Sequence, residues 1–570
     1  MTVTSRAVAM NALIMPRERS DRIVTLLLWA FIGGMAIAIL LPLGLLLTRS
    51  FQNAQGIFVG WRNYQKYFES AALFDAFFNS VFVSLMTALI VIPLAFLYAY
   101  GLSRTGMRWK GAFRAMIFVP LLMPGLLKAI ALVYLFGNQG VLKALLFGNT
   151  VYGPIGIILA SVLWTFPHAV LVIGVALMNA DRRLYQAAEI LNTSALRSFF
   201  AVTWPACRYG VVTAFLAVFV MVFTDFGIAK VIGGDMSLLS TDIYKEVVGQ
   251  QNFEMGAVIS IVLLIPAIVV FVLERITSGR QSAQITGKSL PFQPKPHPRR
   301  DAAFFVYCLA ISLVILAILG MAQFAALIKF WPYNLNFTLN NYLFDMEGVG
   351  WENFWNSLKM SLSAATLGTA LVFIGATMVE KARFDSVARR ILHMLALLPM
   401  AVPGLVLGLA YLMFVNDPRN PLGFLYGSMS ILVISTVVHL YTVPHLTALT
   451  GLKILSREVD MVNLSLRTPI WRSFLRVIVP TNIPTILDIW LYIFLRAMTT
   501  LSAAIFLYTS QTKLAAIAVI HVDETGYTAS AAAMGMLVVY ACLAFRALHY
   551  IISAVLSGYF QAWRGNTNLK

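Results

Sequence analysis

The stretch GAVISIVLLIPAIVVFVLE, residues 256–274, decides the fold class because its first charged side chain is Glu274 at the very end. A helix needs about 20 mostly apolar residues to cross the roughly 30 Å core of a bilayer. Hydrophobic residues make up 59% of the 570 residues and charged residues 12%, whereas soluble domains carry about 25% charged residues. We therefore predict an all-α polytopic membrane protein with about twelve transmembrane helices. The runs are 23–47, 77–101, 113–136, 154–178, 209–230, 256–274, 303–328, 356–379, 391–415, 426–449, 483–508 and 528–550.

The net charge of +18 could indicate nucleic-acid binding, but the basic residues gather in alternate loops. Loops on the cytoplasmic side of a membrane protein carry the excess of lysine and arginine. This pattern predicts a membrane protein with both termini in the cytoplasm, and nucleic acid is not needed as a partner. Cys207, Cys308 and Cys542 are far apart and match neither a metal site nor a disulfide framework.

Short motifs recur in the same order with a nearly constant shift, which predicts an internal duplication. An even number of spans per unit gives two parallel repeats of six helices, residues 1–277 and 302–570. The Pro-, Gln- and Lys-rich segment 278–301 is the expected cytoplasmic linker. The recurring pairs are Asn79-Ser80 with Asn356-Ser357, Pro124-Gly125 with Pro403-Gly404, Tyr152-Gly153 with Tyr426-Gly427, and Pro167-His168 with Pro444-His445.

Two polar loops also correspond: YQAAEILNTSALRSFFAVTWP at 185–205 and NLSLRTPIWRSFLRVIVP at 463–480. The first predicts a helix, a turn at Asn192, and a second helix that stops before Pro205. A pair of amphipathic interfacial helices would explain the composition. It would not explain the Arg-Ser-Phe…Val…Pro spacing that both loops share.

Both segments, within loops 181–205 and 456–480, resemble the coupling loop of binding-protein-dependent ABC importer permeases. That loop carries Glu-Ala-Ala, a glycine, a phenylalanine and a final proline. In the first loop these positions hold Gln186, Ala187, Ala188, Asn192, Phe199 and Pro205. In the second loop Met461, Val462 and Asn463 replace Glu-Ala-Ala, Arg467 replaces the glycine, and Phe474 and Pro480 remain.

Further segments, such as KFWPYN at 329–334 and LPMAVPG at 398–404, resemble fused permeases for 2-aminoethylphosphonate, which are related to fused ferric-iron permeases. The resemblance implies a small-molecule permease subunit of the bacterial inner membrane that works with two cytoplasmic ABC ATPase subunits and a periplasmic solute-binding protein. It implies an organophosphonate as substrate, with ferric iron as the alternative. Phe199 and Phe474 are then expected to anchor the ATPases as buried aromatic side chains.

The sequence holds no catalytic cluster, and the chain is not expected to be an enzyme. The nearest approach to a phosphate-binding loop, Gly287-Lys288-Ser289, lacks the first glycine of that motif. ATP is therefore expected to be used by the partner subunits, and no cofactor or metal is expected on this chain. A twelve-helix secondary transporter, driven by an ion gradient, and a membrane-embedded enzyme are the other classes considered.

Ionisable residues within the spans are candidates for the translocation pathway because their burial in lipid is costly. These are Lys128, Asp225, Asp488 and Arg496. Asp488 and Arg496 lie about two helical turns apart, so they are expected on similar faces. Lys128 could meet the anionic end of a phosphonate, and Asp225 or Asp488 its ammonium group. Internal ion pairs remain the alternative, and His168 and His445 are expected in packing or gating.

Overall fold

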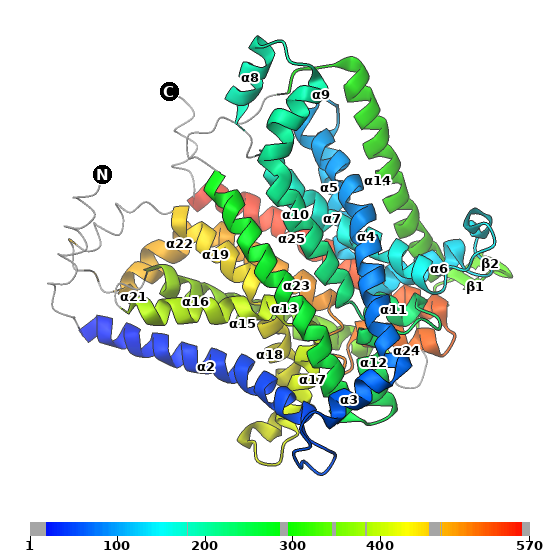
Figure 1. The fold of residues 1–570 in the computed structure, drawn as a ribbon, viewed down its shortest axis with the longest axis vertical. Coiled ribbons are helices and arrows are strands. Elements are labelled where there is room, and N and C mark those ends of the chain that lie inside the picture. The colour runs from blue at the N-terminus through cyan, green and yellow to red at the C-terminus, as the bar shows by residue number, and fades with distance from the viewer. Residues whose placement is uncertain are drawn as a thin grey trace.

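The computed structural model describes residues 19–178, 181–284, 294–344, 349–381, 385–454, 465, 468 and 470–560, which are largely helical (Figure 1). The elements before the linker are α2 (Arg19–Ser50), α3 (Arg62–Glu69), α4 (Ala71–Arg104), α5 (Lys110–Leu122), α6 (Gly125–Phe136), η1 (Lys143–Leu146), α7 (Pro154–Met178), α8 (Arg182–Ile190), α9 (Ala195–Ser198), η2 (Phe199–Thr203), α10 (Trp204–Phe223), α11 (Gly227–Ile232), α12 (Leu239–Tyr244), η3 (Lys245–Gly249) and α13 (Phe253–Gln284).

The second half begins with a long helix and a short antiparallel hairpin, β1 with β2. Its elements are α14 (Pro298–Leu327), β1 (Ile328–Phe330), β2 (Asn334–Phe337), η4 (Asn340–Tyr342), α15 (Trp351–Lys381), α16 (Ser386–Ala401), α17 (Gly404–Val415), η5 (Pro421–Leu425), α18 (Met429–Leu440), α19 (Thr442–Ile454), α21 (Ile470–Ser473), η6 (Phe474–Ile478), α22 (Val479–Thr481), α23 (Ile483–Thr499), α24 (Ala515–Glu524) and α25 (Thr528–Phe560).

The predicted fold class is confirmed. Within the described residues, 8 helices are long and apolar enough to cross a membrane, and four bent helix pairs bring the total to as many as 12 spans. The predicted run 483–508 is too long, because α23 ends at Thr499 and Thr500 has extended backbone, with ψ of 142°. The predicted run 209–230 is likewise interrupted after Phe223, where α10 ends.

Two of the bent pairs break at the prolines that recur between the halves. The angle is 99° between α5 and α6 and 108° between α16 and α17. Met123 and Val402, which precede Pro124 and Pro403, have extended backbone. A residue before proline is pushed out of the helical region by a clash with the proline ring. The Pro-Gly motif therefore divides each span near its middle and creates a bend at the same place in each half.

The Asn-Ser motifs make the same contacts in both halves. The Ser80 hydroxyl accepts a hydrogen bond from the Leu239 N–H at 3.0 Å, and the Ser357 hydroxyl accepts one from the Ala515 N–H at 2.7 Å. Asn79 and Asn356, one residue earlier, donate to backbone carbonyl groups of the same later segments. Each motif therefore ties an early span of its half to the start of a short helix, α12 or α24.

The first long helix of each half packs against the other half. Helix α2 lies along α16 and α17, and α14 lies along α4, α5 and α6 (Figure 1). Hydroxyl groups link these contacts: Tyr411 donates to the Ala38 carbonyl at 2.7 Å, and Tyr307 donates to the Leu94 carbonyl at 2.8 Å. Because the first long helix of each half packs on the other half, the two halves are interlocked, and the bent helices meet at their interface.

Candidate functional site

A cavity of about 520 Å³ lies between the two halves, at the four bends and helix ends that meet there. The first half contributes the α5–α6 bend, α7, α10 and the later part of α13, and the second half contributes the α16–α17 bend, α18 and α23. The polar side chains that line it are Trp164, His168, Thr213, Thr224, Asp225, Glu274, His439, Thr442, Tyr492, Arg496, Thr499, Thr500 and Ser502. An apolar-walled interface cavity with a few polar groups is the usual form of a small-molecule site.

Two of the four predicted pathway residues, Asp225 and Arg496, line this cavity. The Asp225 carboxylate also accepts a hydrogen bond from the Ile228 N–H at 2.9 Å, so it caps the start of α11. Lys128 lies behind the lining: its side chain is 1% exposed, and its Nζ has no hydrogen-bond partner among the described residues. It nonetheless interacts electrostatically with both Asp225 and Arg496.

Asp488 does not share the face of Arg496, and that prediction is wrong. Its side chain is 62% exposed, and its Oδ1 lies 3.2 Å from Nε2 of His549 on α25. Eight residues at about 100° each turn the helix by two full turns and roughly a further 80°. That rotation places Asp488 against α25 on the outside of the bundle, while Arg496 faces the cavity.

The two recurring histidines have different environments. His168 lines the cavity, whereas His445 lies 3.3 Å from His393, between ring nitrogens, with Tyr441 stacked on it. His439 also lines the cavity, and the repeat alignment does not find it because the corresponding residue of the first half is Val162. Glu274 was missed as well, since it reads as the ordinary polar end of an apolar run.

On the face of the molecule opposite α8 and α9, the halves are joined by an ion pair between α11 and α24, which are neighbours in Figure 1. Lys230 Nζ lies 2.7 Å from Glu524 Oε1 and 5.1 Å from the centre of the Tyr244 ring. Tyr244 in turn stacks on Phe506 of the second half, with ring centres 6.4 Å apart. The cavity lies on the other side of this contact, toward the loop that carries α8.

The first coupling loop forms the predicted helix and turn. Asp181 caps α8, and Asn192, at the glycine position of the motif, has a left-handed φ of 47°. Glycine is the usual residue in that conformation, and asparagine is one of the few that tolerate it. The second helix does not stop before Pro205. It continues as α9, the π-helical turn η2 and α10, and Pro205 follows directly after the π turn, where the regular helical hydrogen bonds are interrupted.

The predicted anchor residues pack against their own chain. Phe199 lies 6.0 Å from Phe96, between ring centres, and Phe474 lies 6.0 Å from Phe373. The residue that follows each one points outward: Phe200 is 60% exposed and Leu475 is 59% exposed. The shared spacing thus fixes each loop to its half through the phenylalanine, and the adjacent side chain is the one available to a partner.

Other residues of the loops are likewise either exposed or held by contacts with their own chain. Gln186 and Ala187 are exposed on α8, and the Ala188 carbonyl accepts a hydrogen bond from the Thr193 hydroxyl at 2.7 Å. In the second half Pro480 lies in the first turn of α22, after the π-helical turn η6. Arg467 and the residues at 461–463 lie outside the described residues, and so do residues 285–293 of the predicted linker 278–301, whose two ends belong to α13 and α14.

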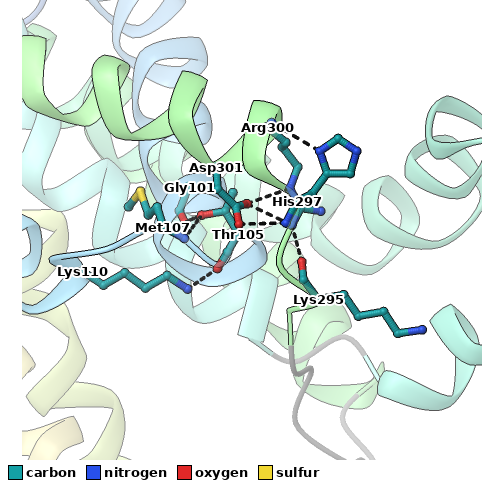
Figure 2. Close-up of polar contacts among 8 residues, drawn as sticks. All are labelled: Gly101, Thr105, Met107, Lys110, Lys295, His297, Arg300 and Asp301. Atoms are coloured by element: carbon teal, nitrogen blue, oxygen red, sulfur yellow. Dashed lines mark hydrogen bonds and ion pairs between the residues drawn. The ribbon is translucent and has the colours of Figure 1, made fainter.

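The described end of the linker is fixed to the first half beside the coupling loop (Figure 2). The Asp301 carboxylate accepts hydrogen bonds from the N–H groups of His297, at 3.0 Å, and Gly106. Arg300 donates to Asp301 and to the Lys295 carbonyl, the latter at 2.7 Å. Lys295 itself forms an ion pair with Glu189 of α8. The entry to α14 is therefore in contact with both the turn after α4 and the coupling helix.

Comparison with known proteins assigns this architecture. Residues 91–283, which include α8, α9 and the first-half lining of the cavity, match the family described as "Binding-protein-dependent transport system inner membrane component". Over residues 91–283 the chain therefore carries an inner-membrane transport component of this family. The relatives named below are themselves called permease proteins, which agrees with a transporter component in place of an enzyme.

Two relatives are similar over a length that exceeds either half of this permease. The putative ferric transport system permease protein FbpB 1 of Haemophilus influenzae is 27% identical over 452 residues, 76% of this chain and 70% of the relative. The ferric transport system permease protein FbpB of Actinobacillus pleuropneumoniae is 26% identical over 482 residues, 82% of this chain and 69% of the relative. A bacterial alginate ABC transporter structure is 18% identical, with a TM-score of 0.38, over 47% of this chain and 97% of that one.

Proposed function

We propose that this permease is the membrane subunit of an ABC importer for ferric iron. The observation that carries the substrate is the fused length of the match to two relatives named as ferric permeases. Ferric iron therefore takes the place of organophosphonate as the proposed main substrate, because neither relative is named for a phosphonate. A periplasmic solute-binding protein would deliver the substrate, and two cytoplasmic ATPase subunits would supply the energy.

The two coupling loops are the proposed contact with the ATPases. Exposed apolar side chains on a polar loop mark a surface that a partner covers. The first loop presents Ile190, Leu191, Leu196 and Phe200, and the second presents Trp471 and Leu475. Since α9, η2 and α10 form one continuous helix, a movement of the loop is passed directly to the cavity wall at Thr213.

The cavity and the Lys230–Glu524 contact support a pathway with alternating access. In this conformation the halves are bridged on the face opposite the coupling loops, and the cavity lies between that bridge and the loops. We infer that this face is periplasmic, both termini are cytoplasmic, and ATP-driven approach of the loops separates α11 from α24. The substrate would then enter from the binding protein and leave toward the cytoplasm.

The experiment is uptake of radiolabelled iron by bacteria that lack the native gene and carry the chain with its ATPase and binding protein. The Phe200→Ala and Leu475→Ala double variant, altered only on exposed surface, is expected to insert normally and to lose most uptake. Exposed Leu548→Ala on α25 is the matched control and is expected to transport normally. Uptake of 2-aminoethylphosphonate but not of iron would overturn the substrate, and uptake without the ATPase would overturn the class.

A further inference from the structure

Four basic side chains lie at or behind the wall of the cavity, two from each half. Lys128 and His168 come from the first half, and His439 and Arg496 come from the second. Arg496, His168 and His439 line the cavity directly. Because these three side chains line one cavity, they can act on one occupant, and the Lys128 side chain lies buried behind them.

These groups lack compensating partners within the described chain. No carboxylate there forms an ion pair with Arg496, and the buried Nδ1 atom of His439 has no hydrogen-bond partner. The Lys128 Nζ is also without one. Two acids line the cavity: Asp225, which already accepts the Ile228 N–H as the cap of α11, and Glu274 of α13, which forms no ion pair with Arg496 in the described part of the chain. Buried donors without acceptors are costly, so an occupant that accepts hydrogen bonds is favoured here.

The α16–α17 bend keeps part of this set open to the cavity. Gly404 begins α17 at the bend, where a methyl group would lie 2.4 Å from Ser502 Oγ and 3.1 Å from His439 Nε2. Any side chain at this position would crowd both polar atoms. Because glycine stands there, the serine hydroxyl and the imidazole of His439 remain within reach of a ligand, beside Thr499 and Arg496.

We propose that the interface cavity contains an oxyanion-binding subsite in which Arg496 is the principal charge and His168, His439 and Ser502 are hydrogen-bond donors. Guanidinium groups bind carboxylate and phosphate oxygens through paired, charge-assisted hydrogen bonds. A bare metal cation would be repelled by Arg496 and Lys128 at this range. The permeant species therefore carries an oxyanion, either alone or as the outer ligand of a ferric complex.

This inference rests on the proposed function in one respect, namely that the cavity is the pathway. A subsite within a pathway must release its occupant, and one guanidinium with neutral donors binds more loosely than a cluster of paired charges would. The subsite also explains how an iron permease could keep two cations at its centre. The iron would cross with anionic ligands that these cations recognise.

The test is protection of a single thiol in the purified permease. Thr499→Cys places a reactive thiol in the cavity, whereas the three native cysteines are buried. Its labelling by a neutral maleimide is measured with increasing inorganic phosphate, 2-aminoethylphosphonate, citrate or ferric citrate, with potassium chloride as the ionic-strength control. We expect at least one oxyanion to slow labelling, and we expect Arg496→Gln to raise the concentration needed by about tenfold or more.

Matched variants separate the subsite from general effects. Arg496→Lys keeps the charge and is expected to retain most protection, and exposed Arg546→Gln on α25 is expected to match the wild type. Protection by ferric citrate at lower concentrations than by citrate indicates an anionic iron complex, and protection by phosphonate or phosphate alone indicates a free oxyanion. Equal protection with and without Arg496, or none by any oxyanion, overturns the proposal. Protection without ATPase-dependent uptake in cells would instead count against the proposed function.

Discussion

Lys230 of the first half and Glu524 of the second form an ion pair of 2.7 Å on the face opposite the coupling loops. The pair is half-exposed, so by itself it contributes at most about 1 kcal/mol. Its importance lies in its position, because Lys230 also lies against Tyr244, which stacks on Phe506 across the interface. The ion pair and the two rings together close one end of the path between the halves.

Cross-linking tests whether this contact must open. Lys230→Cys with Glu524→Cys, joined by a short bifunctional maleimide, is expected to stop uptake while leaving ATP binding by the partner subunits intact. The charge-reversed pair, Lys230→Glu with Glu524→Lys, is expected to restore what either single reversal loses. Lys245→Ala is the control, since Lys245 pairs with Asp242 within the same half at 3.4 Å. Normal transport by the cross-linked protein would contradict a gating role.

The neighbouring phenylalanines of the first coupling loop should separate docking from stability. Phe199→Ala removes ring contacts with Phe96 and Tyr100 and is expected to lower the free energy of unfolding by about 1–3 kcal/mol. Phe200→Ala changes an exposed side chain and is expected to leave the melting temperature unchanged while weakening ATPase binding about tenfold. Thermal unfolding and co-purification of the ATPase measure the two effects. If Phe199→Ala instead weakens ATPase binding and Phe200→Ala lowers the melting temperature, Phe199 is the anchor.

Replacement of Lys128 by methionine should separate electrostatics from packing. Methionine has a similar shape and removes a buried ammonium group without a hydrogen-bond partner, so the variant is expected to be as stable as the wild type or more so. Uptake of the substrate is expected to fall, because Arg496 would then act on the oxyanion without its neighbouring charge. Melting temperature and uptake, measured on the same preparation, check this. Unchanged uptake would reduce Lys128 to a structural residue.

Asp523, next to Glu524 and outside the candidate spans, predicts a pH dependence. Burial, and secondarily the charge of Glu524, raise the pKa of Asp523 to about 6. A carboxyl group with a raised pKa in the folded state stabilises that state when protonated. This contribution is complete below pH ~4 and is lost as the pH rises through about 6. Asp523→Asn is expected to remove this loss, about 3 kcal/mol at most, with exposed Asp235→Asn as the control. If the melting temperatures of Asp523→Asn and the wild type change in the same way between pH 4 and 7, the effect is excluded.

Much of the fold followed from the sequence because hydrophobic length reports directly on membrane spans. The repeated Pro-Gly pairs located both bends, since a proline constrains the residue before it wherever it stands. The angles of the bends could not be predicted from the sequence. The packing of α2 and α14 on the opposite halves could not be predicted either, because both features depend on contacts between distant segments. Apolar runs alone do not determine which half a helix joins.

The site was predicted only in part. Arg496 and Asp225 were found because charges within apolar runs are conspicuous, but Asp488 has the same sequence signature and lies on the outside. The two side chains differ because they lie on different faces of α23, and the apolar residues around each charge do not reveal which face that is. His439 and Ser502 gave no sequence signal, since a lone histidine or serine in a span is ordinary. Phe199 was located correctly as a motif residue, but its contacts were not foreseeable from spacing.

The most direct measurement of the central claim is uptake of labelled iron, supplied as ferric citrate or on its binding protein, by proteoliposomes that contain this permease with its two ATPase subunits. The account predicts uptake that requires ATP and the binding protein, persists without an ion gradient, and falls with the exposed loop variant Phe200→Ala. Uptake driven by a proton or sodium gradient in the absence of ATP and the ATPase subunits would contradict it.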